Sequence, residues 1–318
     1  MQVPVLSIII PCYNEEEAIE NTLKTLLDYL KELTDRNIVS EKSFLYLVDD
    51  GSSDKTYSIL EKWHNENPDK IKVLKFSKNF GNQKAILAGL LEVRKYNPDC
   101  CVTIDADLQQ DERTIEKFLE EFKKGNQIVC GIRNDRKTDS FSKKFTALAF
   151  YKFINLLGVD MEPNHSDFRL VSKEVLEVLS RYREVNLFLR GVFQEFGFKK
   201  QYVYFDVRPR LQGESKFNFF SLMTLALQGI TSFSIVPLRF VSVTGFIMFF
   251  TSLLLAIHAV YEKVANQNTV SGWATIVMAL AIIGGLQILC IGIIGEYLGQ
   301  LFQEVKARPR YIVEKELE

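Results

Sequence analysis

The sequence predicts an α/β protein with a doubly wound, mostly parallel sheet, followed by amphipathic helices and a hairpin of two apolar helices. Two observations lead to this prediction. Between residues 5 and 130, short apolar runs alternate with helical stretches, which is the order of elements in a parallel sheet. Nearer the C-terminus, only three of the 62 residues from Phe240 to Leu301 are charged, a pattern typical of membrane-spanning helices.

The overall composition narrows the class of protein. The chain of 318 residues has a net charge of −1, with 47% hydrophobic and 25% charged residues. Such averages exclude collagen-like, disordered and disulfide-scaffold proteins, and a near-neutral balance argues against a dedicated nucleic-acid binder. The five cysteines are an odd number without C-x-x-C spacing, which favours a reducing compartment. The three histidines show no metal-ligand spacing.

Each apolar run in the first half of the chain is interpreted as one strand. Val5–Ile10 predicts a strand buried on both faces, and Asn14 is expected to cap the helix that follows it. Ser53 or Asp54 is expected to cap the second helix. Further strands are predicted over 44–48, 71–76, 100–104 and 127–130, and further helices over 82–96 and 113–124. Ligands bind at the carboxyl ends of strands in such sheets, where this chain carries polar clusters.

These polar clusters are acidic and not glycine-rich. No G-x-G-x-x-G follows the first strand and no G-x-x-x-x-G-K-[ST] occurs, which argues against a dinucleotide-dependent dehydrogenase and a P-loop NTPase. Asp105 and Asp107, with Gln109 beyond them, supply oxygen ligands for Mg²⁺ or Mn²⁺. A metal held there can bind a nucleotide diphosphate and neutralise its charge as it leaves. Taken alone, two such aspartates are more often part of a solvated loop.

Several motifs occur together and in order along the chain. They are Pro11-Cys12-Tyr13-Asn14-Glu15, Val48-Asp49-Asp50-Gly51-Ser52-Ser53-Asp54, Asn79-Phe80-Gly81-Asn82-Gln83-Lys84, Asp105-Ala106-Asp107-Leu108-Gln109, Ser166-Asp167-Phe168-Arg169-Leu170, Gly213-Glu214-Ser215-Lys216, Gly295-Glu296-Tyr297-Leu298-Gly299 and Arg308-Pro309-Arg310-Tyr311-Ile312-Val313. The first four resemble the GT-A fold glycosyltransferases of family 2. The full set resembles the polyisoprenyl-phosphate glycosyltransferases, and the two apolar segments are most similar to those of the bactoprenol glucosyltransferase type. The resemblance covers nearly the whole chain.

The resemblance implies a donor-binding set and a metal site. The donor-binding set consists of Pro11, Tyr13, Glu15, Asp50, Lys84, Asp105 and Asp107. Within it, Asp50 would hydrogen-bond the uracil or ribose of the donor, while Asp107 and Gln109 would coordinate Mg²⁺ or Mn²⁺. Two alternatives stay open. The first is that one of Asp49 and Asp50 serves only to form the turn before Gly51. The second is that Asn79 and Lys84 only cap the following helix and do not face the donor phosphate.

The resemblance also implies an acceptor that is a lipid phosphate, bound by cations near the bilayer. The acceptor-phosphate set consists of Arg133, Lys144, Arg210 and Lys216, and the catalytic set of Asp107, Asp167 and Arg133. Asp167 is expected to orient the acceptor or the sugar hydroxyls and not to abstract a proton. A phosphate is already anionic near pH 7, because its second pKa is about 6. An ordinary solvated surface is the alternative for these cations.

The chain is expected to divide into four parts. Residues 1–215 form the glycosyltransferase domain, 216–238 an interfacial amphipathic helix, 239–300 two transmembrane helices at about 240–261 and 273–297, and 301–318 a C-terminal tail. A second interfacial helix is expected over Phe145–Leu157, and packing against the sheet is the alternative for both. Lys and Arg residues flank the two spans, whereas the connecting loop has only Lys263. The domain and both termini are therefore expected in the cytoplasm.

The function implied by the resemblance is inverting transfer of a sugar, glucose from UDP-glucose, to undecaprenyl phosphate on the cytoplasmic leaflet of the inner membrane. Transfer from GDP-mannose, as in dolichyl-phosphate mannose synthases, or from another UDP-sugar is the alternative. A processive polysaccharide synthase is disfavoured because the chain has two expected spans and no Q-x-x-R-W motif. An inactive membrane-anchored interaction protein is disfavoured because Asp105, Asp107 and Gln109 are all present. A homo-oligomer, such as a tetramer, is also implied.

Overall fold

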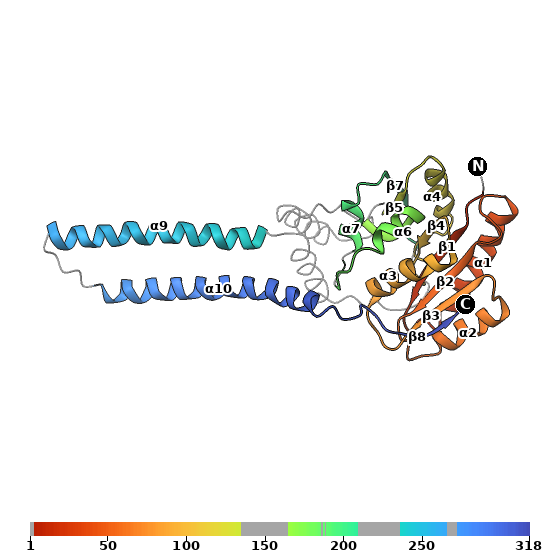
Figure 1. Ribbon diagram of the computed structural model, residues 1–318, viewed down its shortest axis with the longest axis horizontal. Coiled ribbons are helices and arrows are strands. Elements are labelled where there is room, and N and C mark those ends of the chain that lie inside the picture. The colour runs from red at the N-terminus through yellow and green to blue at the C-terminus, as the bar shows by residue number, and fades with distance from the viewer. Residues whose placement is uncertain (1–2, 135–164, 186, 188, 209–235, 266–271) are drawn as a thin grey trace.

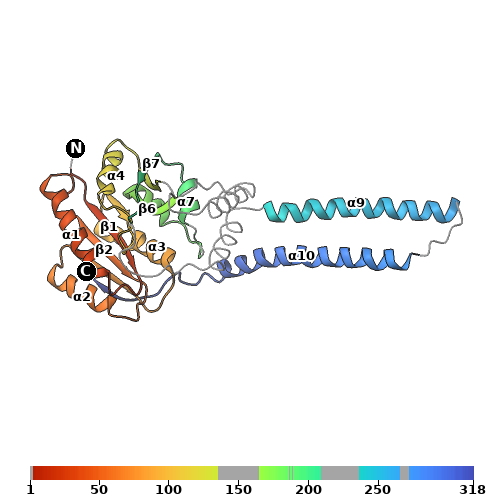
Figure 2. The ribbon, with the colours of Figure 1, turned by 180° about the vertical axis from the view of Figure 1, so that it is seen from behind.

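The computed structural model describes residues 3–134, 165–185, 187, 189–208, 236–265 and 272–318. In this part of the chain, an eight-stranded sheet with helices on both faces forms the main body, and two long helices project from it side by side (Figures 1 and 2). The strand order is β7-β5-β6-β4-β1-β2-β3-β8. The predicted fold, a mostly parallel sheet followed by a helical hairpin, is confirmed.

The centre of the sheet is parallel because each strand is followed by a crossover helix. The strands are β1 (Leu6–Cys12), β2 (Phe44–Asp49), β3 (Ile71–Phe76) and β4 (Cys100–Thr103). The helices are α1 (Ile19–Asp35), α2 (Thr56–Glu66), α3 (Asn82–Glu92) with the 3₁₀ turn Val93–Tyr96, and α4 (Thr114–Lys123). β1 pairs in parallel with both β2 and β4, and all of its residues are buried, as its largely apolar sequence predicts. Helices on opposite faces then enclose two separate apolar cores.

The first predicted helix cap is wrong. Helix α1 begins only at Ile19, and no side chain caps its N-terminus. Asn14 instead has a positive φ of 51°, and its Oδ1 accepts a hydrogen bond from the N–H of Ser53 at 2.9 Å. At the second helix, Asp54 Oδ1 accepts from the N–H of Thr56 at 2.9 Å, but the N-cap is Lys55 without a side-chain hydrogen bond, so neither Ser53 nor Asp54 is the predicted cap. Asn14 therefore joins two loops at the edge of the sheet.

The second half of the sheet departs from parallel order. β5 (Ile128–Arg133) pairs in parallel with β7 (Lys200–Phe205), and between β4 and β5 lies the antiparallel strand β6 (His165–Ser172). The short helices α6 (Lys173–Leu179) and α7 (Leu189–Glu195) follow β6 and pack on the same face as α3. Because β6 is antiparallel, its first residues lie at the edge where β4 and β5 end.

The hairpin consists of α9 (Val236–Ala265) and α10 (Trp273–Val305), which contain the two predicted spans. Figures 1 and 2 both show these helices lying side by side along their length. A helix of 30 residues is about 45 Å long, more than the hydrocarbon thickness of about 30 Å. Among the described residues, Ile282–Val305 is long and apolar enough to cross a membrane, with a mean hydropathy of 1.7. Its exposed apolar side chains indicate membrane association.

The C-terminal tail returns to the sheet. Its last residues form β8 (Val313–Leu317), which pairs antiparallel with β3 and occupies the edge of the sheet. Glu316 of β8 accepts a hydrogen bond from the hydroxyl of Tyr46 at 3.0 Å and forms an ion pair with Lys95. The C-terminal end of the hairpin is therefore attached to the sheet, and the start of α9 and the end of α10 both face the sheet domain (Figure 1).

The end of α10 and the chain between it and β8 are fixed to the sheet domain by three side chains. The carboxylate of Glu304 accepts hydrogen bonds from the N–H of Val185 at 3.0 and 2.8 Å. Arg310 donates to the carbonyl oxygen of Glu184 at 2.7 Å. The ring of Tyr311 stacks on Phe76 with the centroids 5.1 Å apart. Glu184 and Val185, which bind the end of the hairpin, precede α7 in the sequence.

Candidate active site

The described site residues predicted from the sequence lie at one edge of the sheet. Pro11 and Asp50 come from the ends of β1 and β2, Asp105 follows β4, and Arg133 is the last residue of β5. Asp167 belongs to the first residues of β6 and reaches the same edge because that strand is antiparallel. Five segments that are distant in sequence thus contribute polar side chains to one place, as is usual for ligand sites in open α/β sheets.

The loop after β1 lies beside the loop after β2. Asp50 donates its N–H to the carbonyl oxygen of Cys12 at 2.8 Å. Glu15 donates its N–H to the hydroxyl of Thr56 at 2.8 Å, so the loop is held at the start of α2. Pro11 is buried, Glu15 is partly exposed, and Tyr13 is exposed at the rim. These three members of the predicted donor-binding set therefore lie at the end of β1 and on the loop after it, next to Asp50.

Asp50 joins two loops through its carboxylate. Its oxygens accept hydrogen bonds from the N–H of Phe80 at 2.6 Å and from the N–H of Gly81 at 2.9 Å. Burial raises the pKa of Asp50, while these two N–H groups and the nearby Lys84 oppose the rise. The next residue, Gly51, has a φ of +65°, and a Cβ there would lie 2.3 Å from the carbonyl carbon of Lys78. The structure thus places Asp50 and Lys84 together, and α3 begins without a side-chain cap.

Asp49 has a different environment from Asp50. Its side chain is fully buried; Oδ2 accepts from the N–H of Ser52 at 3.4 Å, and Oδ1 has no hydrogen-bond partner. Burial is the main cause that raises the pKa of Asp49 above its ordinary value. The turn-forming alternative therefore fits Asp49, because its one hydrogen bond closes the turn before α2.

Asp49→Asn is expected to stabilise the sheet domain at neutral pH. A raised folded-state pKa means that ionisation costs folding stability, so the cost is absent below the ordinary pKa of 3.8 and grows as the pH rises through the folded-state value. Removing an unpaired buried charge should contribute about 1 kcal/mol, or an unfolding midpoint about 2–4 °C higher at pH 8. Thermal unfolding at pH 4 and pH 8 measures this. The exposed Asp69→Asn serves as the control, and an equal gain at both pH values would contradict the argument.

Asp105 lies at the centre of the acidic cluster. Its N–H donates to Gln110 Oε1 at 2.8 Å, and Gln110 Nε2 donates back to Asp105 Oδ2 at 2.5 Å. Burial and the charges of Asp167 and Asp107 raise the pKa of Asp105 to about 6, against the opposing effect of Arg133. The charges of all three predicted catalytic residues, Asp107, Asp167 and Arg133, therefore act on Asp105.

The acidic loop has an unusual backbone. Leu108, between the two predicted metal ligands, has a positive φ of 48°, which is costly for a bulky residue. This turn allows the N–H of Gln109 to donate to Asp107 Oδ1 at 3.1 Å. The apolar side chain of Leu108 is buried in the core below the site. Such strain typically persists at functional sites, where surrounding packing maintains it.

The donor set of this loop fits a hard divalent cation. Asp105, Asp107 and Gln109 offer carboxylate and amide oxygens, which are the ligands that Mg²⁺ and Mn²⁺ prefer. Asp107 and Asp167 repel the negative charge of Asp105, and a bound cation would reduce this repulsion. Among the described residues, no three His, Cys, Asp or Glu side chains form a complete metal cage. Asp107 and Gln109 would thus hold the cation together with ligands from outside the protein.

Asp167 is the most heavily hydrogen-bonded carboxylate of the site. Arg190 of α7 binds both of its oxygens, through Nε at 3.1 Å and Nη2 at 2.8 Å. Arg169 Nη2 donates to Oδ1 at 3.0 Å, and Gln83 Nε2 of α3 donates to Oδ2 at 3.0 Å. Asp167 therefore connects β6, α3 and α7 at the edge of the site.

Four residues of the site were missed by sequence reasoning, namely Gln110, the partner of Asp105, and the three partners of Asp167. Gln83 and Arg169 lie inside motifs quoted from the sequence, and Gln110 directly follows such a motif. Arg190 lies outside every motif, but it is a single cation within the otherwise apolar stretch Leu187–Phe193. A charge in such a position must find an acidic partner, which was the available signal.

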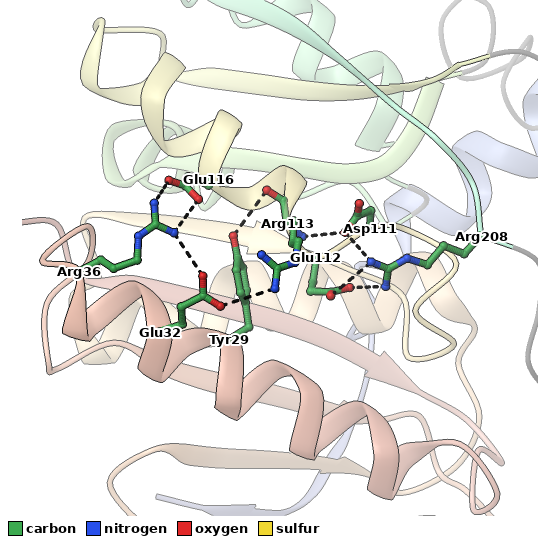
Figure 3. Close-up of polar contacts among 8 residues, drawn as sticks. All are labelled: Tyr29, Glu32, Arg36, Asp111, Glu112, Arg113, Glu116 and Arg208. Atoms are coloured by element: carbon green, nitrogen blue, oxygen red, sulfur yellow. Dashed lines mark hydrogen bonds and ion pairs between the residues drawn. The ribbon is translucent and has the colours of Figure 1, made fainter.

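An ion-pair network holds the chain after the acidic loop (Figure 3). Arg208, just beyond β7, pairs with Glu112 at 2.6 Å and with Asp111 at 2.8 Å. Its main-chain N–H donates to the carbonyl oxygen of Gln109 at 2.9 Å. The rest of the network connects α1 with the start of α4 and consists of Tyr29, Glu32, Arg36, Arg113 and Glu116. These contacts fix the end of the acidic loop, at Gln109 to Glu112, to Arg208, which lies two residues before Arg210 in the sequence.

Part of the predicted acceptor site lies outside the described residues. This applies to Lys144, Arg210 and Lys216, and to the two predicted interfacial helices, Phe145–Leu157 and 216–238 up to residue 235. Of the acceptor-phosphate set, Arg133 is described, and it lies beside Asp105.

Comparison with known proteins identifies both parts of the chain. The family model "Glycosyl transferase family 2" matches residues 7–180, and the model "GtrB C-terminal hairpin" matches residues 236–301. These two regions contain most of the described sheet and the described hairpin. The family resemblance predicted from the motifs is confirmed.

Individual relatives are similar over nearly their whole length. An uncharacterized glycosyltransferase, YkoT of Bacillus subtilis (strain 168), is 43% identical over 99% of this chain and 92% of its own. A prophage-derived bactoprenol glucosyl transferase of Shigella flexneri is 35% identical over 98% and 97%. A solved mannosyltransferase of Pyrobaculum calidifontis, in complex with GDP-Man and Mn²⁺, has 15% identity and a TM-score of 0.46, covering 96% and 88%. The chain is an enzyme of glycosyl transferase family 2 that carries a GtrB-type C-terminal hairpin.

Proposed function

We propose that the enzyme transfers a sugar from a nucleotide-sugar to a polyisoprenyl phosphate, with inversion at the anomeric carbon. The donor proposed is UDP-glucose and the acceptor undecaprenyl phosphate, on the cytoplasmic leaflet of the inner membrane. The observation that carries the proposal is the cluster of Asp105, Asp107, Asp167 and Arg133 in a domain whose hairpin leaves and rejoins the same sheet. Relatives with the same hairpin are named bactoprenol glucosyl transferases, which supports the lipid acceptor.

The position of the hairpin supports an acceptor that stays in the membrane. If α9 and α10 both cross the bilayer, the shared sheet requires that both of their outer ends lie on one side. The Lys and Arg residues next to those ends favour the cytoplasmic side. The end of α10 binds Val185, and the chain from there leads into α7, whose Arg190 contacts Asp167. A short stretch of chain thus connects the end of α10, where the hairpin meets the sheet domain, with the site.

The proposed reaction is a single displacement. An oxygen of the acceptor phosphate forms a bond to the anomeric carbon, while the bond from that carbon to the diphosphate oxygen breaks. The nucleoside diphosphate leaves with the electron pair, so the configuration inverts. A strong general base is unnecessary, because the acceptor phosphate is already ionised near pH 7, with a second pKa of about 6.

Each described residue has a place in this displacement. Asp50 and Lys84 lie where a donor base, ribose or phosphate would bind, with Pro11 and Tyr13 on the adjacent loop. Arg133, a cation at the end of β5, is placed to bind the acceptor phosphate. When bound by Asp107 and Gln109, a divalent cation supplies neutralisation of the leaving diphosphate. The roles of Lys144, Arg210 and Lys216 in acceptor binding, and assembly into a homo-oligomer, stay predictions.

A donor panel tests the proposal. The purified full-length protein in lipid nanodiscs is given radiolabelled UDP-glucose, GDP-mannose or a UDP-aminosugar, with undecaprenyl phosphate or a soluble glycan as acceptor. We expect label in the lipid fraction from UDP-glucose and undecaprenyl phosphate only. Labelled lipid formed from GDP-mannose or a UDP-aminosugar would show that the proposed donor is wrong, while the proposed lipid acceptor would be retained. Equal transfer to the soluble glycan would contradict the proposal.

A further inference from the structure

Asp167 is held by three residues that were not among the predicted site residues. Its side chain is 11% exposed, and its two oxygens accept four hydrogen bonds from Arg190, Arg169 and Gln83. Bonds from three residues on three different elements, at both oxygens, fix the orientation of the carboxylate. A carboxylate held in this way is suited to a fixed orientation and not to proton uptake.

The two arginines that bind Asp167 differ in what they can do. Arg169 is two residues away on the same strand, is 1% exposed, and lies over the ring of Phe193 at 4.7 Å. Burial lowers the pKa of Arg169. Arg190 comes from a different element, α7, and its side chain is 28% exposed. Arg169 therefore belongs to the core, whereas Arg190 sets how Asp167 is oriented relative to the rest of the site.

We propose that Arg190 is a positioning residue, which acts on sugar transfer through Asp167. Its two-point hydrogen bond keeps the Asp167 carboxylate in a fixed orientation beside Asp105, and through Gln83 it aligns the start of α3, where Lys84 lies. This inference rests on the proposed transfer reaction. Lysine cannot replace arginine at such a site, since a point charge lacks the planar pair of donors.

The chain offers a matched control for this ion pair. Arg94 binds Glu177 with the same two atoms, Nε at 3.1 Å and Nη2 at 2.7 Å, but on the surface, with side chains 30% and 48% exposed. Arg94→Gln removes the same kind of contact without touching the site. Its activity is expected to equal that of the unmodified enzyme.

A double-mutant cycle tests the proposal. Arg190→Gln is expected to lower kcat about 100-fold and Arg190→Lys about 10-fold, with the KM of the donor changed less than about threefold. Asp167→Asn should lower kcat as well, because its amide group would face the donors of Arg190 and Gln83. Arg190→Gln added to Asp167→Asn should lower kcat less than about threefold further. Losses that multiply in the double variant, or full activity of Arg190→Gln, would overturn the proposal.

Thermal unfolding of the same variants separates positioning from simple loss of structure, and it does not depend on turnover. If Arg190 and Asp167 form the pair described, their effects on the unfolding midpoint are less than additive, whereas Arg94→Gln and Asp167→Asn add independently. Additive midpoints for the Arg190 and Asp167 pair would overturn the inference even if no donor supported turnover. Absence of turnover in the unmodified enzyme with every donor would instead contradict the proposed function.

Discussion

Asp107→Ala is expected to abolish sugar transfer by the enzyme. Asp107 is one of two predicted ligands of the divalent cation, and it contributes to the charge cluster around Asp105. Removal of one preorganised group that stabilises the charge of a transition state lowers kcat by about 10²–10³-fold. Initial rates of lipid-linked product formation, with the best donor of the panel and saturating Mg²⁺ or Mn²⁺, measure the effect.

Two controls make this result specific to the acidic loop. Asp69→Ala removes an exposed carboxylate at the opposite end of the sheet, before β3, and should leave the rate unchanged. A chelator should stop turnover of the unmodified enzyme, and added Mg²⁺ or Mn²⁺ should restore it. Full metal-dependent activity of Asp107→Ala would show that the cation is held elsewhere.

Ending the chain after Ile312 is expected to destabilise the whole sheet domain, although the removed residues lie far from the acidic loop. The truncation deletes β8, leaving the edge of β3 unpaired over Val73–Phe76. It also removes Glu316, the hydrogen-bond partner of Tyr46. With about 1 kcal/mol for each lost hydrogen bond, the domain should lose about 3 kcal/mol or more.

The truncated chain should also aggregate, since an open, apolar strand edge is a template for pairing between molecules. Thermal unfolding and size-exclusion chromatography in detergent check both effects. Lys315→Ala is the control, because it removes only surface contacts, the ion pair to Glu61 and the cation–π contact with Tyr57, and retains the strand. A truncated chain with an unchanged unfolding midpoint would mean that β8 contributes nothing to the sheet.

The part of the site that could be predicted is the part that follows from local patterns. Largely apolar runs such as Val5–Ile10 identify parallel strands, and the parallel order alone places Asp50 and Asp105 at one edge. The family resemblance then singles out Asp167, which lies in a quoted motif, and Arg133, which follows the fifth predicted strand. In the described structure these residues do lie together, although their roles in the reaction stay predictions.

The missed features depend on contacts between distant residues. β6 inserts antiparallel between β4 and β5, and no local pattern encodes which strands flank it. Arg190 meets Asp167 only because α7 packs on the face of the sheet next to α3. Asn14 looked like a helix cap because its residue type suits that position, but its side chain binds another loop. In each case tertiary packing decides between locally equivalent options.

The return of the chain to β3 has a consequence for the order of synthesis. β3 ends at Phe76, while its partner β8 begins at Val313, after both hairpin helices. At roughly 5–20 residues per second, the ribosome needs roughly 10 to 50 seconds to pass from one to the other. During that interval the growing chain carries an open strand edge while its apolar hairpin emerges. A nascent chain that stalls at the hairpin therefore lacks the last strand of its sheet, so the domain is completed only after the hairpin has been synthesised.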